Sequence, residues 1–245
     1  MRRVIGCWRL LRISGHILAG VWTASVRLPR LPPPERWARV QAWALAFLGH
    51  AGIALEIRGR PPVTGPVLLV CNHLSWLDIP VMHAARHCRF VSKSDVRGWP
   101  IVGALATAAG TLYIERGSGR DALRVMHRMA EALKAEELLA VFPEGTTGDG
   151  RALLPFHANL LQAAVSAGSP AQAVGLRFID RASGQISRAP SYKGDETLLG
   201  SIWRTVCAPA IVAVVHFGQI ELCEGRDRRA WSRDLRDAVE VLRRS

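Results

Sequence analysis

A histidine and an aspartate five residues apart are the residues of this chain best suited to acid–base chemistry. His73 and Asp78 lie in the segment NHLSWLD, directly after the apolar run 67–71, and catalytic groups in α/β sheets gather beyond the carboxyl ends of strands. A turn that brings the carboxylate to one imidazole nitrogen fixes the tautomer and leaves the other nitrogen free to accept a proton. We therefore interpret this pair as the catalytic centre. The alternatives are that His73 only caps the turn, or that His216, at the end of another apolar run, is the functional histidine.

Polar side chains follow three further apolar runs of strand length. A lysine supports an anion, an arginine offers a planar fork that suits phosphate, and a polar Glu-Gly-Thr-Thr loop presents backbone N–H groups to hydroxyl or phosphate groups. Each feature alone is equally compatible with a solvated lysine, a surface ion pair or a simple turn. Four strand ends that all carry functional side chains indicate one rim of a sheet, and therefore one site. The residues after these three runs are Lys93, Arg116, Glu144, Gly145, Thr146 and Thr147.

The elements that must position these residues are indicated by alternating apolar runs and helical patterns from about residue 53 onward. Fully apolar runs are typical of strands buried on both faces, and alternation with helices predicts an α/β domain whose layered central β-sheet is flanked by helices. Helical stripes follow from the spacing of apolar residues over 123–133, 158–167 and 231–242. The expected strands are residues 67–71, 89–92, 111–114, 138–142, 173–178 and 211–217.

The first 60 residues carry most of the excess positive charge. They contain ten arginines, two glutamates and four of the eight tryptophans, and so contribute +8 of the net charge of +12. Arginine and tryptophan both settle at the lipid headgroup boundary, and each basic residue near an anionic leaflet contributes roughly 1 kcal/mol. The expected partner is therefore an anionic membrane surface. No zinc-finger spacing, RNP-like motif or basic-zipper heptad is present, so nucleic acid is not an expected partner.

Two N-terminal helices are expected before the main domain. Residues 13–26 are mostly apolar but shorter than the ~20 residues of a spanning helix, which favours an interfacial or partly inserted helix, with a cleaved signal peptide as the alternative. The turn at Pro32–Pro34 precedes a second helical pattern, which either binds lipid or packs on the core. We therefore predict a membrane-associating two-helix motif over residues 1–52 and the main domain over residues 53–245.

The four strand-end blocks together resemble the glycerolipid acyltransferases of the lysophosphatidic acid (1-acyl-sn-glycerol-3-phosphate) acyltransferase type. NHLSWLD fits the N-H-x4-D box of that family, and SKSDVRGWPIVG, GTLYIERG and FPEGTT follow in the family's order over roughly residues 65–180. The resemblance implies that His73 is the general base and that Asp78 orients it. It also implies a set of residues around the acceptor glycerol-phosphate, its phosphate or the developing oxyanion. This substrate-binding set comprises Asn72, Ser75, Lys93, Arg116, Glu144, Gly145, Thr146 and Thr147.

The family transfers an acyl group from acyl-CoA or acyl carrier protein to a lysolipid hydroxyl, without metal or cofactor. The resemblance therefore implies 1-acylglycerol-3-phosphate as acceptor and phosphatidic acid as product. It also implies an enzyme at the inner (cytoplasmic) membrane, peripheral or N-terminally anchored, with its site facing the cytoplasm. Five cysteines without a CxxC pair favour a reducing compartment and no zinc site.

Departures from the family pattern leave the acceptor open. Thr147 stands where the family often has arginine, Ala173 stands where proline is usual, and Asp95-Val96 replaces Glu-Leu. These changes, with the segment YKGD at 192–195, are similar to a subgroup that includes acyltransferases acting on lyso-ornithine lipids.

Two other classes of protein compete with a lysolipid acyltransferase. A serine hydrolase or thioesterase with Ser75 as nucleophile is disfavoured by the absence of a GxSxG segment. Ser75 is also only two residues from His73, an awkward spacing for a nucleophile and its base. A non-catalytic membrane-binding protein is disfavoured by the intact set of polar strand-end residues.

Overall fold

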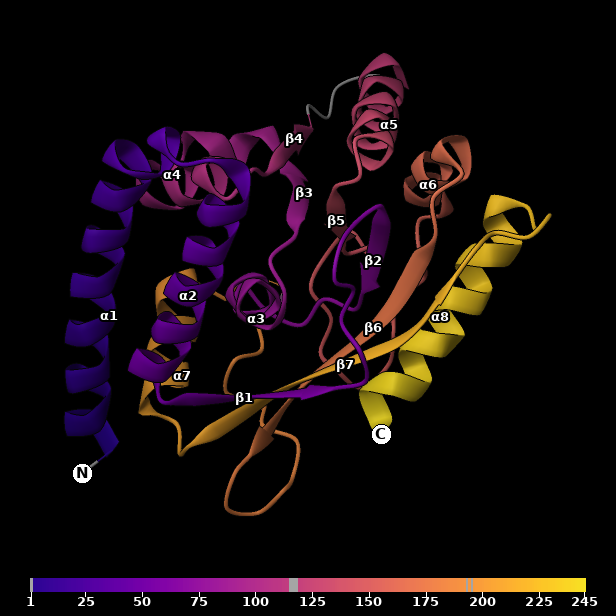
Figure 1. Cartoon of the computed structure of the whole chain (residues 1–245). Coiled ribbons are helices and arrows are strands. Elements are labelled where there is room, and N and C mark those ends of the chain that lie inside the picture. The colour runs from indigo at the N-terminus through magenta and orange to yellow at the C-terminus, as the bar shows by residue number, and fades with distance from the viewer. Residues whose placement is uncertain (1, 115–118, 193, 195) are drawn as a thin grey trace.

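A seven-stranded sheet forms the centre of the protein. The computed structural model describes residues 2–114, 119–192, 194 and 196–245 (Figure 1). The strand order is β1-β7-β6-β2-β5-β3-β4; β6 and β7 pair antiparallel, and every other neighbouring pair is parallel. The strands are β1 (Ile53–Arg58), β2 (Val67–Cys71), β3 (Arg89–Lys93), β4 (Leu112–Ile114), β5 (Leu138–Val141), β6 (Ala171–Asp180) and β7 (Ile211–Glu221).

The predicted α/β fold is confirmed, and all six expected strands are present. The strand that the sequence did not reveal is β1, which lies at the edge of the sheet beside β7; only Ile53 of this strand is buried, and its other positions are partly or fully exposed. Its Glu56 and Arg58 form an ion pair at 2.7 Å. An edge strand of this kind lacks the continuous apolar run that marks a strand covered on both faces.

Helices cover both faces of the sheet, as the alternation of side chains along β2 requires. Leu69 and Cys71 belong to the cluster on one face, with helices α2 and α3. Leu68 and Val70 belong to the cluster on the other face, with helices α5, α6 and α8. The helices are α1 (Arg2–Val26), α2 (Pro33–Ala51), α3 (Asp78–Ala85), α4 (Pro100–Ala108), α5 (Gly119–Lys134), α6 (Gln162–Ala167), α7 (Leu198–Cys207) and α8 (Arg228–Arg244), with short 3-10 turns η1 (Leu28–Arg30), η2 (Ser94–Gly98) and η3 (Ala158–Leu161).

The helical patterns of the sequence correspond to α5, to η3 followed by α6, and to α8. Gly168 closes α6 with a positive φ of 61°, the left-handed conformation that favours glycine at a helix end. Helices α3, α4 and α7 were not predicted. They are short, at eight to ten residues, and so give too few turns for a clear periodic pattern.

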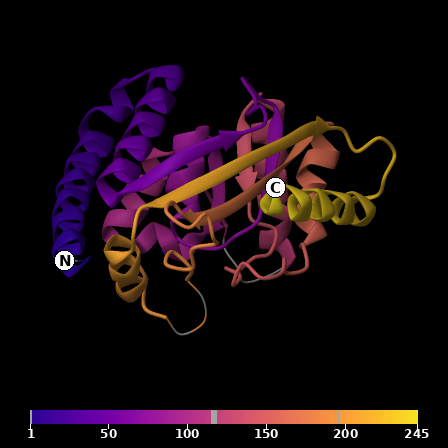
Figure 2. The same cartoon turned by 90° about the horizontal axis from the view of Figure 1, so that it is seen from below.

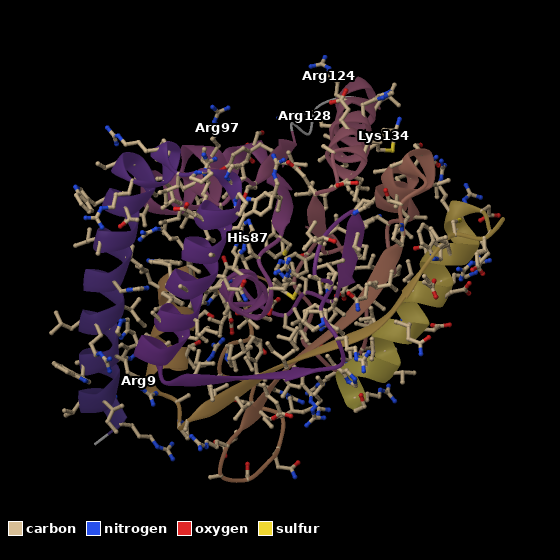
Figure 3. All side chains as sticks on the ribbon, in the orientation of Figure 1. Arg9, His87, Arg97, Arg124, Arg128 and Lys134 are labelled. Carbon is tan, nitrogen blue, oxygen red and sulfur yellow. The ribbon has the colours of Figure 1, made fainter. Side chains whose placement is uncertain are left out.

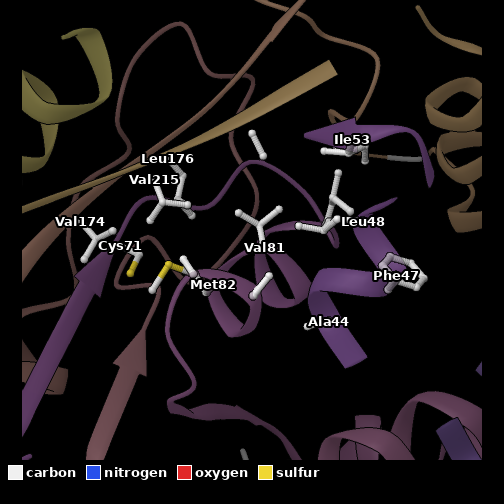
Figure 4. Packing of buried hydrophobic residues seen from close by; sticks show 14 of the residues in the cluster. Ala44, Phe47, Leu48, Ile53, Cys71, Val81, Met82, Val174, Leu176 and Val215 are labelled. Carbon is white, nitrogen blue, oxygen red and sulfur yellow. The ribbon is translucent and has the colours of Figure 1, made fainter. Parts of the chain in front are cut away.

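The two N-terminal helices lie side by side at one end of the molecule, and α8 lies towards the other end (Figure 2). Helix α2 packs on α3, and Leu48 lies towards Val81 in the cluster of buried residues (Figure 4). The predicted second helix therefore contributes to the same core as the main domain. Whether residues 1–52 act as a separate motif stays a prediction.

Helix α1 is longer than its expected apolar run. It begins at Arg2, and within the described residues the stretch Arg2–Arg30 alone is long and apolar enough to cross a membrane by length and composition. Only 17% of its apolar window is buried in the protein. Side chains on its outer face are exposed, among them Val4, Trp8, Leu11, Leu18 and Trp22.

Candidate active site

The turn between β2 and α3 joins the predicted catalytic pair. His73 Nδ1 lies 2.8 Å from Asp78 Oδ2, so the carboxylate holds this ring nitrogen and leaves Nε2 for proton transfer. The imidazole is partly exposed, at 19% of its side-chain area, whereas the Asp78 side chain is fully buried. The imidazole is therefore open to solvent on one side, whereas the carboxylate that holds it is shielded from water.

Backbone groups of the same turn fix the position of the carboxylate. Asp78 Oδ2 accepts hydrogen bonds from the backbone N–H groups of Leu74 at 2.6 Å and Ser75 at 2.8 Å. The Asp78 backbone N–H in turn donates to the Ser75 carbonyl at 3.2 Å. The spacing of five residues between His73 and Asp78 therefore lets the turn fold back, so that one carboxylate oxygen reaches both the imidazole and the backbone N–H groups of the turn.

An aromatic ring covers one face of the imidazole. The rings of His73 and Phe142 are stacked with centroids 4.1 Å apart and planes 8° apart. Phe142 follows β5 directly, so the strand beside β2 supplies this contact. The stacking restricts rotation of the imidazole and complements the constraint from Asp78.

The stacked pair continues as a series of rings that runs back into the protein, which we call the ring column. Phe142 stacks on Phe90 of β3, with centroids 5.3 Å apart, and His83 of α3 meets Phe90 edge to face at 5.1 Å. His83 stacks on His87 at 5.1 Å, and His87 lies 6.0 Å from Trp37 of α2. The ring column comprises His73, Phe142, Phe90, His83, His87 and Trp37, and Figure 3 shows His87 in the interior of the protein.

Glu144 joins two loops of the site through both carboxylate oxygens. Oε1 accepts the backbone N–H of His73 at 2.7 Å, and Oε2 accepts that of Leu154 at 2.8 Å. The side chain is buried, which raises the pKa of its carboxyl, while the two backbone hydrogen bonds act in the opposite direction. A second link, from the Gly148 N–H to the His73 carbonyl at 2.8 Å, holds the same loop from the other side.

Asn72 and Ser75 are fully buried behind the catalytic turn. The Asn72 amide exchanges two hydrogen bonds with the backbone of Leu176 in β6, at 2.7 and 3.0 Å. Ser75 Oγ donates to the Pro190 carbonyl and accepts the Leu77 N–H. Both side chains therefore anchor the turn, and direct contact of either with substrate stays a prediction.

The remaining predicted site residues lie on the rim that the sequence indicated. Strands β2, β5, β3 and β4 are neighbours in this order and run parallel, so their carboxyl ends share one edge of the sheet. Lys93 is exposed at the end of β3, Gly145 and Thr146 are exposed after β5, and Thr147 is half-buried. Arg116 lies outside the described residues.

Comparison with known proteins identifies the family of this chain. The sequence matches the profile of the Acyltransferase family over residues 54–177, which is half of the chain. The chain belongs to the Acyltransferase family. The resemblance inferred from the four strand-end blocks is thereby confirmed, and the protein is an O-acyltransferase.

Relatives of this acyltransferase fall into two groups by name. The lyso-ornithine lipid O-acyltransferase of Pseudomonas aeruginosa is 36% identical over 242 residues, which cover 95% of this chain and 91% of the relative. The 1-acyl-sn-glycerol-3-phosphate acyltransferase of Neisseria gonorrhoeae is 36% identical over 213 residues, 86% of this chain and 82% of the relative. In fold, the chain is similar to the crystal structure of the 1-acyl-sn-glycerophosphate acyltransferase of Thermotoga maritima. The TM-score is 0.71 at 17% identity, covering 100% of this chain and 95% of that one.

Two parts of the ring column were missed by sequence reasoning. Phe142 was taken only as the end of a strand, although its place before Pro143-Glu144 puts it beside His73. His83 and His87 were set aside as histidines in helical or loop context; His83 lies in α3, and His87 follows the end of that helix, so no periodic pattern in the sequence marks the pair. No group of three or more metal-ligating side chains forms within the part of the chain that the structure describes.

Acid should destabilise this acyltransferase through the two buried histidines. Burial lowers the pKa of His83 to about 3 and of His87 to about 4; His87 adds to the shift of His83, and Arg86 and Arg89 add to that of His87. An unfolded histidine titrates near pH 6.5, so the unfolded chain binds more protons below that pH. The free energy of unfolding that the two neutral histidines contribute is fully present above about pH 6.5 and falls as the pH drops towards 4. The expected slope is up to about 1.4 kcal/mol per pH unit for each histidine.

Denaturant unfolding in detergent at pH 7, 6 and 5 measures this slope, with the double variant His83→Leu/His87→Leu as comparison. The variant should show a clearly flatter dependence on pH over this range. Equal slopes for the two proteins would mean that other groups cause the acid sensitivity.

Proposed function

We propose that this acyltransferase moves a fatty acyl group from an acyl thioester, acyl-CoA or acyl carrier protein, to the free hydroxyl of a lysolipid at a membrane surface. The observation that carries the proposal is the 2.8 Å contact between His73 Nδ1 and Asp78. It leaves Nε2 of a partly exposed imidazole as the proton acceptor. The membrane location is supported by the exposed apolar face of α1 and the basic N-terminal region.

The reaction proposed is a direct transfer. Nε2 of His73 removes the proton of the acceptor hydroxyl as its oxygen attacks the thioester carbonyl. The carbon–sulfur bond breaks, the thiolate leaves and takes up the proton, and the ester is formed without a covalent enzyme intermediate. Asp78 keeps the imidazole in the required tautomer and stabilises its protonated form.

The rim residues are proposed to hold the acceptor and the developing charge. Exposed Lys93 and Thr146 offer an ammonium and a hydroxyl at the edge of the sheet that carries the base. The N–H of Gly145 donates to the Phe142 carbonyl at 3.0 Å, so this exposed glycine is proposed to shape the loop around the acceptor. Thr147 and Arg116 are proposed as further ligands of the acceptor headgroup. The contacts of Glu144, Asn72 and Ser75 support a positioning role for these three side chains.

Two acceptors fit this proposal. The first is 1-acylglycerol-3-phosphate, supported by the Neisseria relatives at 36% and 37% identity and by the lysine at the rim. The second is lyso-ornithine lipid, favoured by the Pseudomonas aeruginosa relative, which matches nearly the whole chain, and by Thr147 in place of an arginine.

The decisive experiment offers the purified protein both donors, acyl-CoA and acyl carrier protein, with a panel of lysolipids. Transfer to 1-acylglycerol-3-phosphate or to lyso-ornithine lipid identifies the acceptor by its product. The absence of transfer to every lysolipid, together with release of free fatty acid, would contradict the proposal. The site is proposed to face the cytoplasm, which protease accessibility in inside-out vesicles tests.

Substitution of Ser75 by alanine separates transfer from hydrolysis. The hydroxyl is fully buried and bonded to the backbone on both sides, so Ser75→Ala should lower stability by about 1 kcal/mol and leave acyl transfer within a few-fold of normal. Product formation and thermal unfolding measure the two effects. Loss of activity with an acyl-enzyme trapped in the unmodified protein would indicate a serine nucleophile instead.

A further inference from the structure

A cavity separate from the catalytic turn lies where the N-terminal helices meet α4. Its volume is about 530 Å³, within the range of small-ligand pockets. The end of α1 and η1 contribute Ala24 and Leu28, and α4 contributes Thr107. Neither His73 nor Asp78 lines it. The cavity therefore belongs to the junction between the two-helix segment and the main domain.

Two arginines give this cavity an uncompensated positive charge. Arg36 of α2 and Arg97 of η2 line it, and no acidic side chain among the described residues does so. One Nη of Arg36 donates to the Leu31 carbonyl at 3.3 Å, and the guanidinium of Arg97 lies 5.9 Å from the centre of the Tyr113 ring. Neither contact supplies a negative charge. An anionic ligand in the cavity would therefore gain charge-assisted hydrogen bonds from the two guanidinium groups.

The surroundings of the cavity are suited to a lipid surface rather than to bulk water. Trp99, Ile101 and Val102, at the beginning of α4, are 41–49% exposed. The outer apolar face of α1 ends at the same junction. Figure 3 shows Arg97 at the margin of the molecule, with Arg124 projecting from α5 along the same margin. Apolar and aromatic side chains next to basic ones are typical of a surface that lies in the headgroup region.

We propose that the cavity binds the phosphate headgroup of an anionic glycerophospholipid of the bilayer, through Arg36 and Arg97. The bound lipid is a component of the membrane and not the acceptor of the reaction. The inference rests on the proposed membrane location of the protein, and it is independent of the chemistry at His73. Because η2 connects Lys93 to α4, a lipid in the cavity also supports the segment that carries one rim residue.

Vesicle flotation with the full-length protein tests the site. The double variant Arg36→Gln/Arg97→Gln is compared with Arg3→Gln/Arg39→Gln, which removes two exposed arginines of the same basic region from outside the cavity. Loss of two charges alone should weaken binding to phosphatidylglycerol-containing vesicles about equally in both, by roughly fivefold per arginine. The cavity variant should lose about tenfold more, because it also loses charge-assisted hydrogen bonds. Binding to pure phosphatidylcholine vesicles should change little in either variant.

Further measurements separate the proposed lipid site from misfolding of the variant and from a site for free phosphate. Arg97→Gln alone keeps the half-buried Arg36 and should show a partial loss, which guards against misfolding of the double variant. Equal losses in the two double variants would overturn the site. Inorganic phosphate is also titrated without vesicles. If phosphate binding requires Arg36 and Arg97 while the two double variants float equally well, the cavity binds free phosphate and not a lipid headgroup. Failure of the unmodified protein to float with any vesicle would refute the membrane location, whereas the catalytic proposal fails only in the transfer assay.

Discussion

Replacing His73 by alanine should reduce acyl transfer by about 10²- to 10⁴-fold, the usual contribution of a general base. The imidazole is the group that Asp78 and Phe142 hold in place, and alanine leaves no proton acceptor at this position. Product formation under saturating donor and acceptor measures the loss. Folding and vesicle binding should stay normal, because the side chain is partly exposed and lies apart from α1.

His216→Ala is the matched control for this prediction. His216 lies in β7, and its Nδ1 contacts Ser245 Oγ at the surface, so its removal should leave turnover unchanged.

Asp78→Asn tests the contribution of the carboxylate to the pair. The fully buried carboxylate oxygen accepts three N–H groups, so the amide should impair both activity and stability. Normal turnover of the His73 variant would exclude the imidazole as base.

Glu144→Gln should lower both stability and turnover, and it should do so without weakening the apparent affinity for the acceptor. Glutamine has one oxygen for the two backbone N–H groups of His73 and Leu154, so one buried donor meets an N–H₂ group instead of an acceptor. Leaving that donor unsatisfied costs about 1–3 kcal/mol. The backbone of the base is then less well held, and kcat should fall by at least about tenfold, since small misplacements of reacting groups are costly.

Steady-state kinetics separate the two possible roles of Glu144. A positioning role predicts a lower kcat with KM for the acceptor nearly unchanged, whereas a direct ligand of the acceptor predicts mainly a higher KM. Glu131→Gln, at an exposed position of α5, is the control for removal of one negative charge. An unchanged melting temperature of Glu144→Gln would contradict the structural role that its hydrogen bonds indicate.

The sheet could be predicted because most of its strands are covered on both faces. A run such as 138–142 is then apolar throughout, whereas the edge strand β1 carries Glu56 and Arg58 and is not recognised. The antiparallel pairing of β7 with β6 could not be predicted either, because the direction of a strand depends on the connection before it and not on its own sequence. The rim of the site was predictable because the carboxyl ends of neighbouring parallel strands meet at one edge.

The roles of individual site residues were less accessible to sequence reasoning. Residue types place Asn72, Ser75 and Glu144 near the base, but their partners belong to distant loops. Asn72 bonds Leu176 at a separation of 104 residues, and Ser75 bonds the Pro190 carbonyl at 115. A single sequence gives no information on such pairings. It therefore cannot separate side chains that face a substrate from those that hold the turn.

The ring column links helix α2 to His73, the proposed proton acceptor. Five ring contacts lead from Trp37 on α2 to the imidazole. We therefore expect the orientation of the His73 imidazole to depend partly on how α2 packs against the sheet, although α2 lies far from His73 in the sequence. A change of detergent, or a substitution that loosens α2, should alter turnover while every residue of the catalytic turn stays intact. Removing α2 to obtain a more soluble enzyme would for the same reason remove one support of its base.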